Sequence, residues 1–235
     1  MTCQEVVKKL KAQSNAKNVV GMARFGISTK NTLGVSMPVL RLMGKEIKKD
    51  LKENPKERHQ LALGLWQTGI HEARILAGIV DTAELVTAKQ MDEWVGDFDS
   101  WDVCDQVCMN LFDKTLFAFN KAKEYTQKEQ EFVKRTGFVL MAALAVHNKI
   151  AKDSEFIKFL PLIKKASTDE RNFVKKAVNW ALRQIGKRNK VLNQAAIQTS
   201  QEIQKQKNKT AKWVASNALS ELTSSAVQKR LMNKL

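Results

Sequence analysis

The sequence predicts an all-α protein, and three observations carry this prediction. Its 235 residues include only 3 prolines and 10 glycines, the residues that usually separate short strands. No run alternates β-branched and polar residues between turn signals, which is the pattern of a half-buried strand. A short motif recurs at a spacing of about 40 residues, and in a helical chain this indicates stacked helix pairs.

Capping residues mark several helix starts, because their side chains satisfy the free backbone N–H groups of a first turn. Each start has a Ser, Thr, Asn or Asp, and most also have a proline or an acidic or amide side chain just inside the helix. They are Ser36 with Pro38, Asn54 with Pro55, Thr87 with Gln90, Ser154 with Glu155, and Asp169 ahead of a long periodic run. Many short helices are therefore expected.

The repeated motif is Phe132–Arg135, which recurs as Phe173–Lys176, and Trp213–Val214 opens a similar alanine-rich run further along. One helix pair cannot bury its apolar face alone, so neighbouring pairs stack into a curved α-solenoid, and HEAT-like repeats have this period. The alternative is a coincidence among amphipathic helices rich in Ala and Lys. We predict a single HEAT-like repeat domain over residues 1–235.

The charge is strongly positive, with 40 Lys and Arg against 24 Asp and Glu and a net charge of +16. Residues 91–127 are acidic, whereas the segments before and after them are basic. A concave face lined with basic residues is expected to follow the phosphates of duplex DNA, with an affinity that falls as salt rises. The alternative is a solvated basic surface without a partner. The Lys-rich segment 201–235 either caps the solenoid or contacts DNA.

Other signals narrow the class of protein. The sequence has no apolar run long enough to span a membrane and no secretory leader, so a cytoplasmic protein without a membrane partner is expected. Cys3, Cys104 and Cys108 are an odd number, which argues against a disulfide framework. Cys104 and Cys108 lie one helical turn apart and could hold a metal, but no further Cys or His ligand is near in sequence, so buried thiols are expected. The three histidines share no ligand spacing, so no metal site is predicted.

A candidate for chemistry lies in the acidic stretch, where Trp101 and Asp105 are four residues apart and share one helical face, while Asp102 points elsewhere. A carboxylate repels phosphate, so in a DNA-binding protein it needs a task. It could stabilise an oxocarbenium-like sugar as a cationic alkylpurine departs, with the indole favouring the cation. The alternative for Asp105 is a structural ion pair.

A second aromatic candidate is Trp180, three residues before Arg183 and on the same helical face. Two tryptophans, Trp101 and Trp180, could form the walls of one cleft. The alternative is that Trp180 belongs to the core, where tryptophans at helical spacing are usually found.

Several segments in order resemble the AlkD-type alkylpurine DNA glycosylases, DNA alkylation repair proteins made of HEAT-like repeats. The resemblance runs through nearly the whole chain. Its motifs are Met22–Phe25, Leu33–Val35 with Pro38, Ser100–Asp105, Phe132–Arg135 and Val178–Arg183. Two positions depart from the family's pattern, since Phe25 stands where a tyrosine is frequent and Ser100 replaces a second consecutive tryptophan.

The resemblance implies hydrolysis of the N-glycosidic bond of cationic N3- or N7-alkylated purines in duplex DNA, without metal or organic cofactor. It makes Asp105 the catalytic carboxylate, with Trp101 and Trp180 as aromatic walls against the deoxyribose of the lesion. Arg135 and Arg183 become contacts to the DNA backbone. Phe25 is expected at the DNA as well, without the hydroxyl of the family's tyrosine.

Three hypotheses follow from the sequence. The first is a monomeric, monofunctional DNA glycosylase, without lyase activity because no lysine is placed as a nucleophile. The second keeps the basic face but binds DNA or RNA without bond cleavage, and the missing hydroxyl of Phe25 motivates it. The third, a protein scaffold, is disfavoured by the large positive charge.

Overall fold

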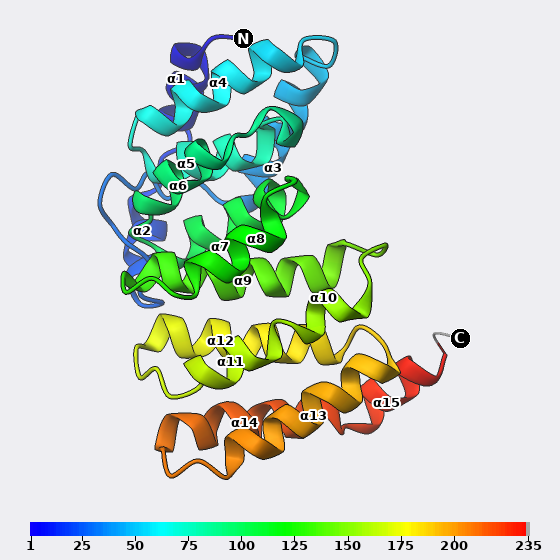
Figure 1. The fold of residues 1–235 in the computed structure, drawn as a ribbon. Coiled ribbons are helices and arrows are strands. Elements are labelled where there is room, and N and C mark those ends of the chain that lie inside the picture. Colours follow the sequence, from blue (N-terminus) through cyan, green and yellow to red (C-terminus); the bar gives the residue numbers. More distant parts are fainter. Residues whose placement is uncertain (234–235) are drawn as a thin grey trace. The chain divides into compact units, whose positions relative to one another are not determined.

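The computed structural model describes residues 1–233, in which every regular element is a helix and no strand occurs (Figure 1). The chain divides into two compact units, unit 1 with residues Met1–Leu116 and unit 2 with residues Phe117–Leu235. The all-α prediction is confirmed. The single domain over residues 1–235 stays a prediction.

Unit 1 is built around helix α5, which contacts α3, α4 and α7. Its helices are α1 (Cys3–Ala12), α2 (Ala16–Ala23), α3 (Met37–Asp50), α4 (Pro55–Gln67), α5 (His71–Val80), α6 (Ala88–Gly96) and α7 (Trp101–Asn110), with short 3-10 turns at Ala83–Leu85 and Phe112–Lys114. The indole rings of Trp66 and Trp94 stack in the core with centroids 4.0 Å apart, and the edge of Phe98 packs against Trp66. Large buried rings of this kind supply much of the apolar contact in a small core.

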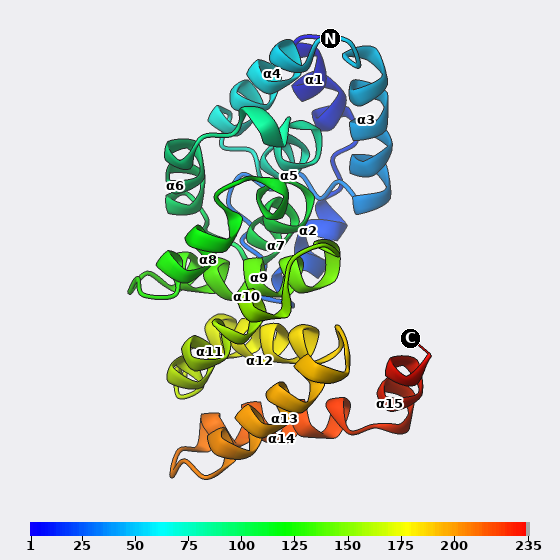
Figure 2. The ribbon, with the colours of Figure 1, turned by 45° about the vertical axis from the view of Figure 1, so that its right-hand side comes forward.

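Unit 2 is a stack of antiparallel helix pairs in which α12 lies between α9 and α14 (Figures 1 and 2). Its helices are α8 (Ala118–Tyr125), α9 (Glu131–His147), α10 (Asp153–Ile157), α11 (Leu160–Ala166), α12 (Asn172–Gly186), α13 (Lys190–Gln204), α14 (Lys209–Leu222) and α15 (Ser225–Met232). Helices α8 and α9 approach closely at Gly137, where a Cβ would lie 2.7 Å from the backbone nitrogen of Thr126. Any larger residue would therefore force the pair apart.

The predicted period is visible in the contacts of unit 2. Polar side chains reach from one helix pair to the next and meet partners 35 to 39 residues away. These contacts join Asn179 to Val214, Asn189 to Asp153, Lys164 to Glu202, and Gln206 to Ser167. The repeat is thus structural, and coincidence between amphipathic helices no longer explains the recurring motif.

Three predicted helix starts are confirmed, because Ser36, Asn54 and Thr87 are the N-caps of α3, α4 and α6. The other two starts are misplaced. Helix α10 is capped by Lys152 and already includes Ser154. Helix α12 is capped by Arg171, two residues after Asp169.

The side chain of Asp169 accepts hydrogen bonds from Arg171 and forms an ion pair with Lys134 on α9. These cations lower the pKa of Asp169 to about 2. Asp169 therefore links two helix pairs instead of capping one of them.

Candidate functional site

Trp101 is the first residue of α7, and Asp105 follows one turn later. Both side chains are partly exposed. The indole Nε1 of Trp101 donates a hydrogen bond to the backbone oxygen of Phe25, 3.1 Å away. The structure thus brings two of the predicted site residues, Trp101 and Phe25, into direct contact within unit 1.

Phe25 lies in the turn that follows α2, and its side chain is 74% exposed. Because its carbonyl oxygen accepts the indole hydrogen bond, the backbone of Phe25 positions Trp101 whatever side chain residue 25 carries. An exposed phenyl ring offers a ligand apolar contact and no hydrogen bond, in contrast to a tyrosine.

Asp102, the second residue of α7, points away from Asp105 into a buried polar network. Its carboxylate accepts a hydrogen bond of 2.6 Å from the hydroxyl of Ser100 and lies 2.8 Å from Nε2 of His71. The imidazole of His71 is almost completely buried. Burial opposes ionisation of Asp102, but the hydrogen bonds and charge of His71 prevail and lower the pKa of this carboxyl group.

The same balance acts on His71. Burial alone would lower the pKa of this imidazole, whereas the hydrogen bond and negative charge of Asp102 outweigh it, so the pKa of His71 is raised. Glu72 and Asp99 add negative potential in the same direction. His71 and Asp102 therefore favour their charged forms as a pair, although both are largely withdrawn from water.

This network also fastens the segment 25–35 to the helices beside it. The backbone N–H of Ser28 donates to the hydroxyl of Ser100 at 3.1 Å, and the N–H of His71 donates to the carbonyl of Asn31 at 3.0 Å. Buried Glu72 accepts hydrogen bonds from three successive backbone N–H groups, those of residues 33, 34 and 35. Trp101 is consequently held by a loop that is itself anchored to α5 and α7.

In unit 2, Trp180 and Arg183 lie on α12, as the sequence predicts. The side chain of Trp180 is partly exposed, and it is not among the fully buried residues of the core. Arg183 donates to the carboxylate of Glu221 on α14, which also holds Lys187. Glu221 keeps a lowered pKa because these two cations outweigh its partial burial.

Arg135 on α9 is only 5% exposed, and its guanidinium donates a hydrogen bond of 2.6 Å to the carbonyl of Phe173. The rings of Phe132 and Phe173 stack nearby with centroids 5.5 Å apart. The repeated motif therefore serves packing between α9 and α12. Arg135 is a residue of this interface, and the sequence alone had assigned it only to a DNA contact.

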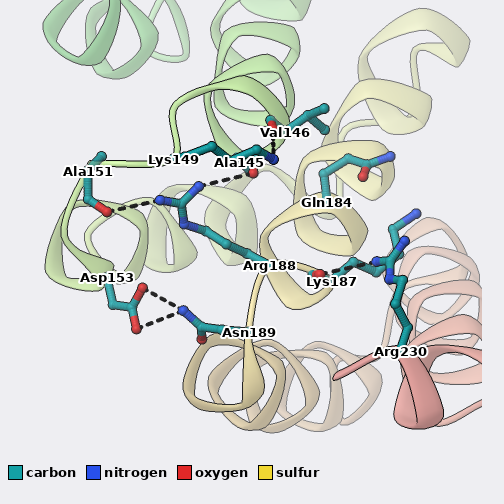
Figure 3. Close-up of a pocket in the computed structure, with 10 residues that line it drawn as sticks. All are labelled: Ala145, Val146, Lys149, Ala151, Asp153, Gln184, Lys187, Arg188, Asn189 and Arg230. Carbon is teal, nitrogen blue, oxygen red and sulfur yellow. Dashed lines mark hydrogen bonds between the residues drawn. The ribbon is translucent and has the colours of Figure 1, made fainter. Parts of the chain in front are cut away.

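A hollow of about 390 Å³ opens at the C-terminal ends of α9 and α12 and is lined by Lys149, Lys187, Arg188 and Arg230 (Figure 3). Arg188 donates to the carbonyls of Ala145 and Ala151 at 3.3 and 3.0 Å and lies over the ring of Phe156. Arg230 donates to the carbonyl of Lys187. Arg188 and Arg230 thus satisfy backbone carbonyl oxygens, and Lys187 is paired with Glu221, so these three cations serve the structure of unit 2.

Other expectations concern the thiols, metals and membranes. Cys104 and Cys108 are buried and free, as predicted, and burial raises the pKa of Cys108 well above its ordinary value. Within residues 1–233, no cluster of three or more His, Cys, Asp or Glu is arranged to hold a metal ion. In the same part of the chain, no helix is both long and apolar enough to cross a bilayer.

Comparisons with known proteins give a family model and a similar solved structure. A family model described as "DNA alkylation repair enzyme" matches residues 6–222. A solved structure, described as a new family of proteins related to the HEAT-like repeat DNA glycosylases with affinity for branched DNA structures, is similar with a TM-score of 0.79. Sequence identity is 19%, and the match covers 98% of this chain and 96% of that chain. None of the curated proteins matches. The HEAT-like repeat fold predicted from the sequence is thereby confirmed.

Proposed function

Because the chain belongs to the DNA alkylation repair enzyme family, we propose that it is a monofunctional DNA glycosylase for cationic N3- and N7-alkylated purines. The observation that carries the proposal is the first turn of α7, where Trp101 and Asp105 lie one turn apart and Trp101 is fixed by the carbonyl of Phe25. This places an aromatic face beside a carboxylate in a strongly basic chain.

The substrate determines what such a site must do. An alkylated purine already carries a positive charge, so the N-glycosidic bond breaks with its electron pair going to the base, which leaves neutral. The deoxyribose becomes an oxocarbenium ion. The carboxylate of Asp105 stabilises this charge and accepts a proton from the water that attacks the anomeric carbon. No covalent enzyme intermediate and no cofactor are required.

The aromatic residues act on the same charge. The indole face of Trp101 attracts a cation through its quadrupole, and Trp180 on α12 offers a second partly exposed indole. Arg183 is a proposed contact to the DNA backbone, whereas Arg135, which the resemblance assigns the same role, is 5% exposed and donates to the carbonyl of Phe173. Arg183 can meet a phosphate only by sharing its guanidinium with Glu221, so it is expected to contribute less than an unpaired arginine.

The test is release of free base from a duplex that carries N7-methylguanine and N3-methyladenine. Asp105→Asn removes the charge with little change in shape, so we expect excision to fall by at least about a hundred-fold, as when an electrostatic stabiliser is removed. Asp99→Asn is the matched control, because Asp99 is an exposed acid two residues before Trp101. Equal rates for wild type and Asp105→Asn would refute this role.

A second candidate is a DNA-binding protein that cleaves no bond. Two observations favour it, the missing hydroxyl at Phe25 and the affinity for branched DNA in the description of the similar solved structure. In that case the wild type releases no base from the alkylated duplex, while its DNA binding persists and weakens as salt rises. Strand cleavage by β-elimination would contradict the monofunctional assignment.

A further inference from the structure

The start of α14 carries a basic run without compensating acids. Between Glu202 and Glu221 the chain contains four lysines, Lys205, Lys207, Lys209 and Lys212, and no Asp or Glu. All four side chains are exposed, and the residues lie in the turn before α14 and on its first turn.

Several other cations of unit 2 already have acid partners. Lys134, Lys164 and Lys187 each form an ion pair with an acid of a neighbouring helix pair. Within residues 1–233, Lys207, Lys209 and Lys212 form no ion pair. Their charge is therefore available to a partner, whereas the charge of Arg183 on α12 is paired with Glu221.

An exposed aromatic ring stands beside these charges. Trp213 is 42% exposed, and the ammonium group of Lys175 lies 5.6 Å from its ring centroid. Trp213 occupies the place in the repeat that Phe132 and Phe173 occupy in the two preceding helix pairs, where the two rings stack on each other. In the described part of the chain no aromatic ring stacks on Trp213.

We propose that Trp213, with Lys175, Lys207, Lys209 and Lys212, binds an unpaired strand of DNA adjoining a duplex. Lysines without acid partners attract phosphates, and an exposed indole offers a surface for stacking. Inside a duplex both faces of each base are covered by its neighbours, so an interior base cannot stack on this ring, whereas an unpaired base can. The inference rests on DNA binding from the proposed function, but not on base excision.

The experiment compares two fluorescent DNA probes, a blunt duplex and the same duplex with a single-stranded oligothymidine tail. For the wild type we expect the tail to raise the affinity. Trp213→Ala should weaken binding of the tailed probe by roughly ten-fold, the loss expected for one stacked base, and leave the blunt duplex unchanged within about two-fold. Trp213→Phe should retain most of the affinity for the tail.

A charge variant tests the same site independently of the aromatic residue. Lys209→Gln combined with Lys212→Gln should lower the salt dependence of binding to the tailed probe, by about 0.7 in logarithmic slope for each single-strand phosphate that the protein no longer neutralises. Lys149→Gln combined with Lys152→Gln is the matched control, because these lysines are also exposed and lie beyond the C-terminal end of α9.

The outcomes are distinct. If the tail adds no affinity, or if Trp213→Ala weakens both probes equally, the inference is wrong while DNA binding stands. If the wild type binds neither probe, both the inference and the proposed function fail. Trp213→Ala is expected to release base from a blunt alkylated duplex at the rate of the wild type. A loss of excision that occurs in Asp105→Asn and not in Trp213→Ala therefore concerns the proposed active site and not this surface.

Discussion

Unit 1 contains two largely buried His–Asp pairs in which the pKa of the carboxyl group is shifted in opposite directions. His59 and Asp81 are 2.6 Å apart, and His71 and Asp102 are 2.8 Å apart. Burial dominates at Asp81 and raises the pKa of that carboxyl group, despite hydrogen bonds from His59, Thr82 and Gln90. At Asp102 the hydrogen bonds prevail and the pKa is lowered.

The carboxylate of Asp81 is fully buried, whereas that of Asp102 is 15% exposed, and the helix ends act in the same direction as these shifts. Asp102 lies in the first turn of α7, where the partial positive charge of free backbone N–H groups favours a carboxylate. Asp81 is the C-cap of α5, where the free carbonyl groups carry partial negative charge and disfavour one. The charge state of a buried pair therefore depends on its place along the backbone as well as on its two side chains.

The largest expected effect comes from Asp102→Ala. This change leaves the buried His71 without its partner and frees Ser100 from one of its hydrogen bonds, so we expect a loss of about 3 kcal/mol in the free energy of unfolding. Urea unfolding at neutral pH measures it. Asp99→Ala, which removes an exposed acid nearby, should lose less than about 1 kcal/mol. Similar losses for both variants would contradict the role of Asp102 as the stabilising partner of buried His71.

A smaller and more selective effect is expected from replacing each carboxylate by its amide. Asp102→Asn should lower the free energy of unfolding at neutral pH by about 1 to 3 kcal/mol, because a charged hydrogen bond is removed. Asp81→Asn should lower it less, since burial already disfavours the charge there. The two variants are compared in the same urea titrations, and the reverse order would contradict the stronger preference of Asp102 for its charged form.

The smallest effect is a difference in pH dependence. The raised pKa of His71 adds stability that is present below its ordinary value of about 6.5 and is lost as pH rises through the raised value. The lowered pKa of Asp102 adds stability that is present above about 3.9 and is lost as pH falls through the lowered value.

The pKa of Asp81 is shifted in the opposite direction to that of Asp102. Its raised pKa adds stability that is present below about 3.9 and is lost as pH rises through the raised value. Unfolding free energies of the wild type and of each Asn variant, measured against pH, separate the pairs. Asp102→Asn should flatten the profile above pH 6.5, whereas Asp81→Asn should leave that part unchanged. If the free energy of unfolding of Asp102→Asn still falls above pH 6.5, the fall belongs to a titrating group other than His71.

The sequence predicts structural features that depend on neighbouring residues better than those that depend on distant contacts. The N-caps Ser36, Asn54 and Thr87 act within one turn, so capping rules find them. The repeat is also legible, because equivalent residues recur along the chain. Asp169 has a residue type that is typical of an N-cap, but its carboxylate forms an ion pair with Lys134 of another helix pair. No local sequence pattern predicts such a contact.

The candidate site shows the same division. Trp101 and Asp105 are paired by helical spacing alone, which the sequence shows directly. The partnership of Asp102 with His71 joins residues 31 positions apart and depends on how α5 packs against α7. The pairing of Arg183 with Glu221 likewise depends on the contact between α12 and α14. Neither partnership has a spacing signature.

The contacts between helix pairs in unit 2 have a consequence for folding kinetics. Since the polar contacts of Asn179, Asn189 and Lys164 reach only the adjacent pair, each one closes a loop of no more than about one repeat. Chains with such low contact order fold rapidly, because little entropy is lost before each new contact forms. Unit 2 can therefore nucleate at any helix pair and grow outward, one pair at a time.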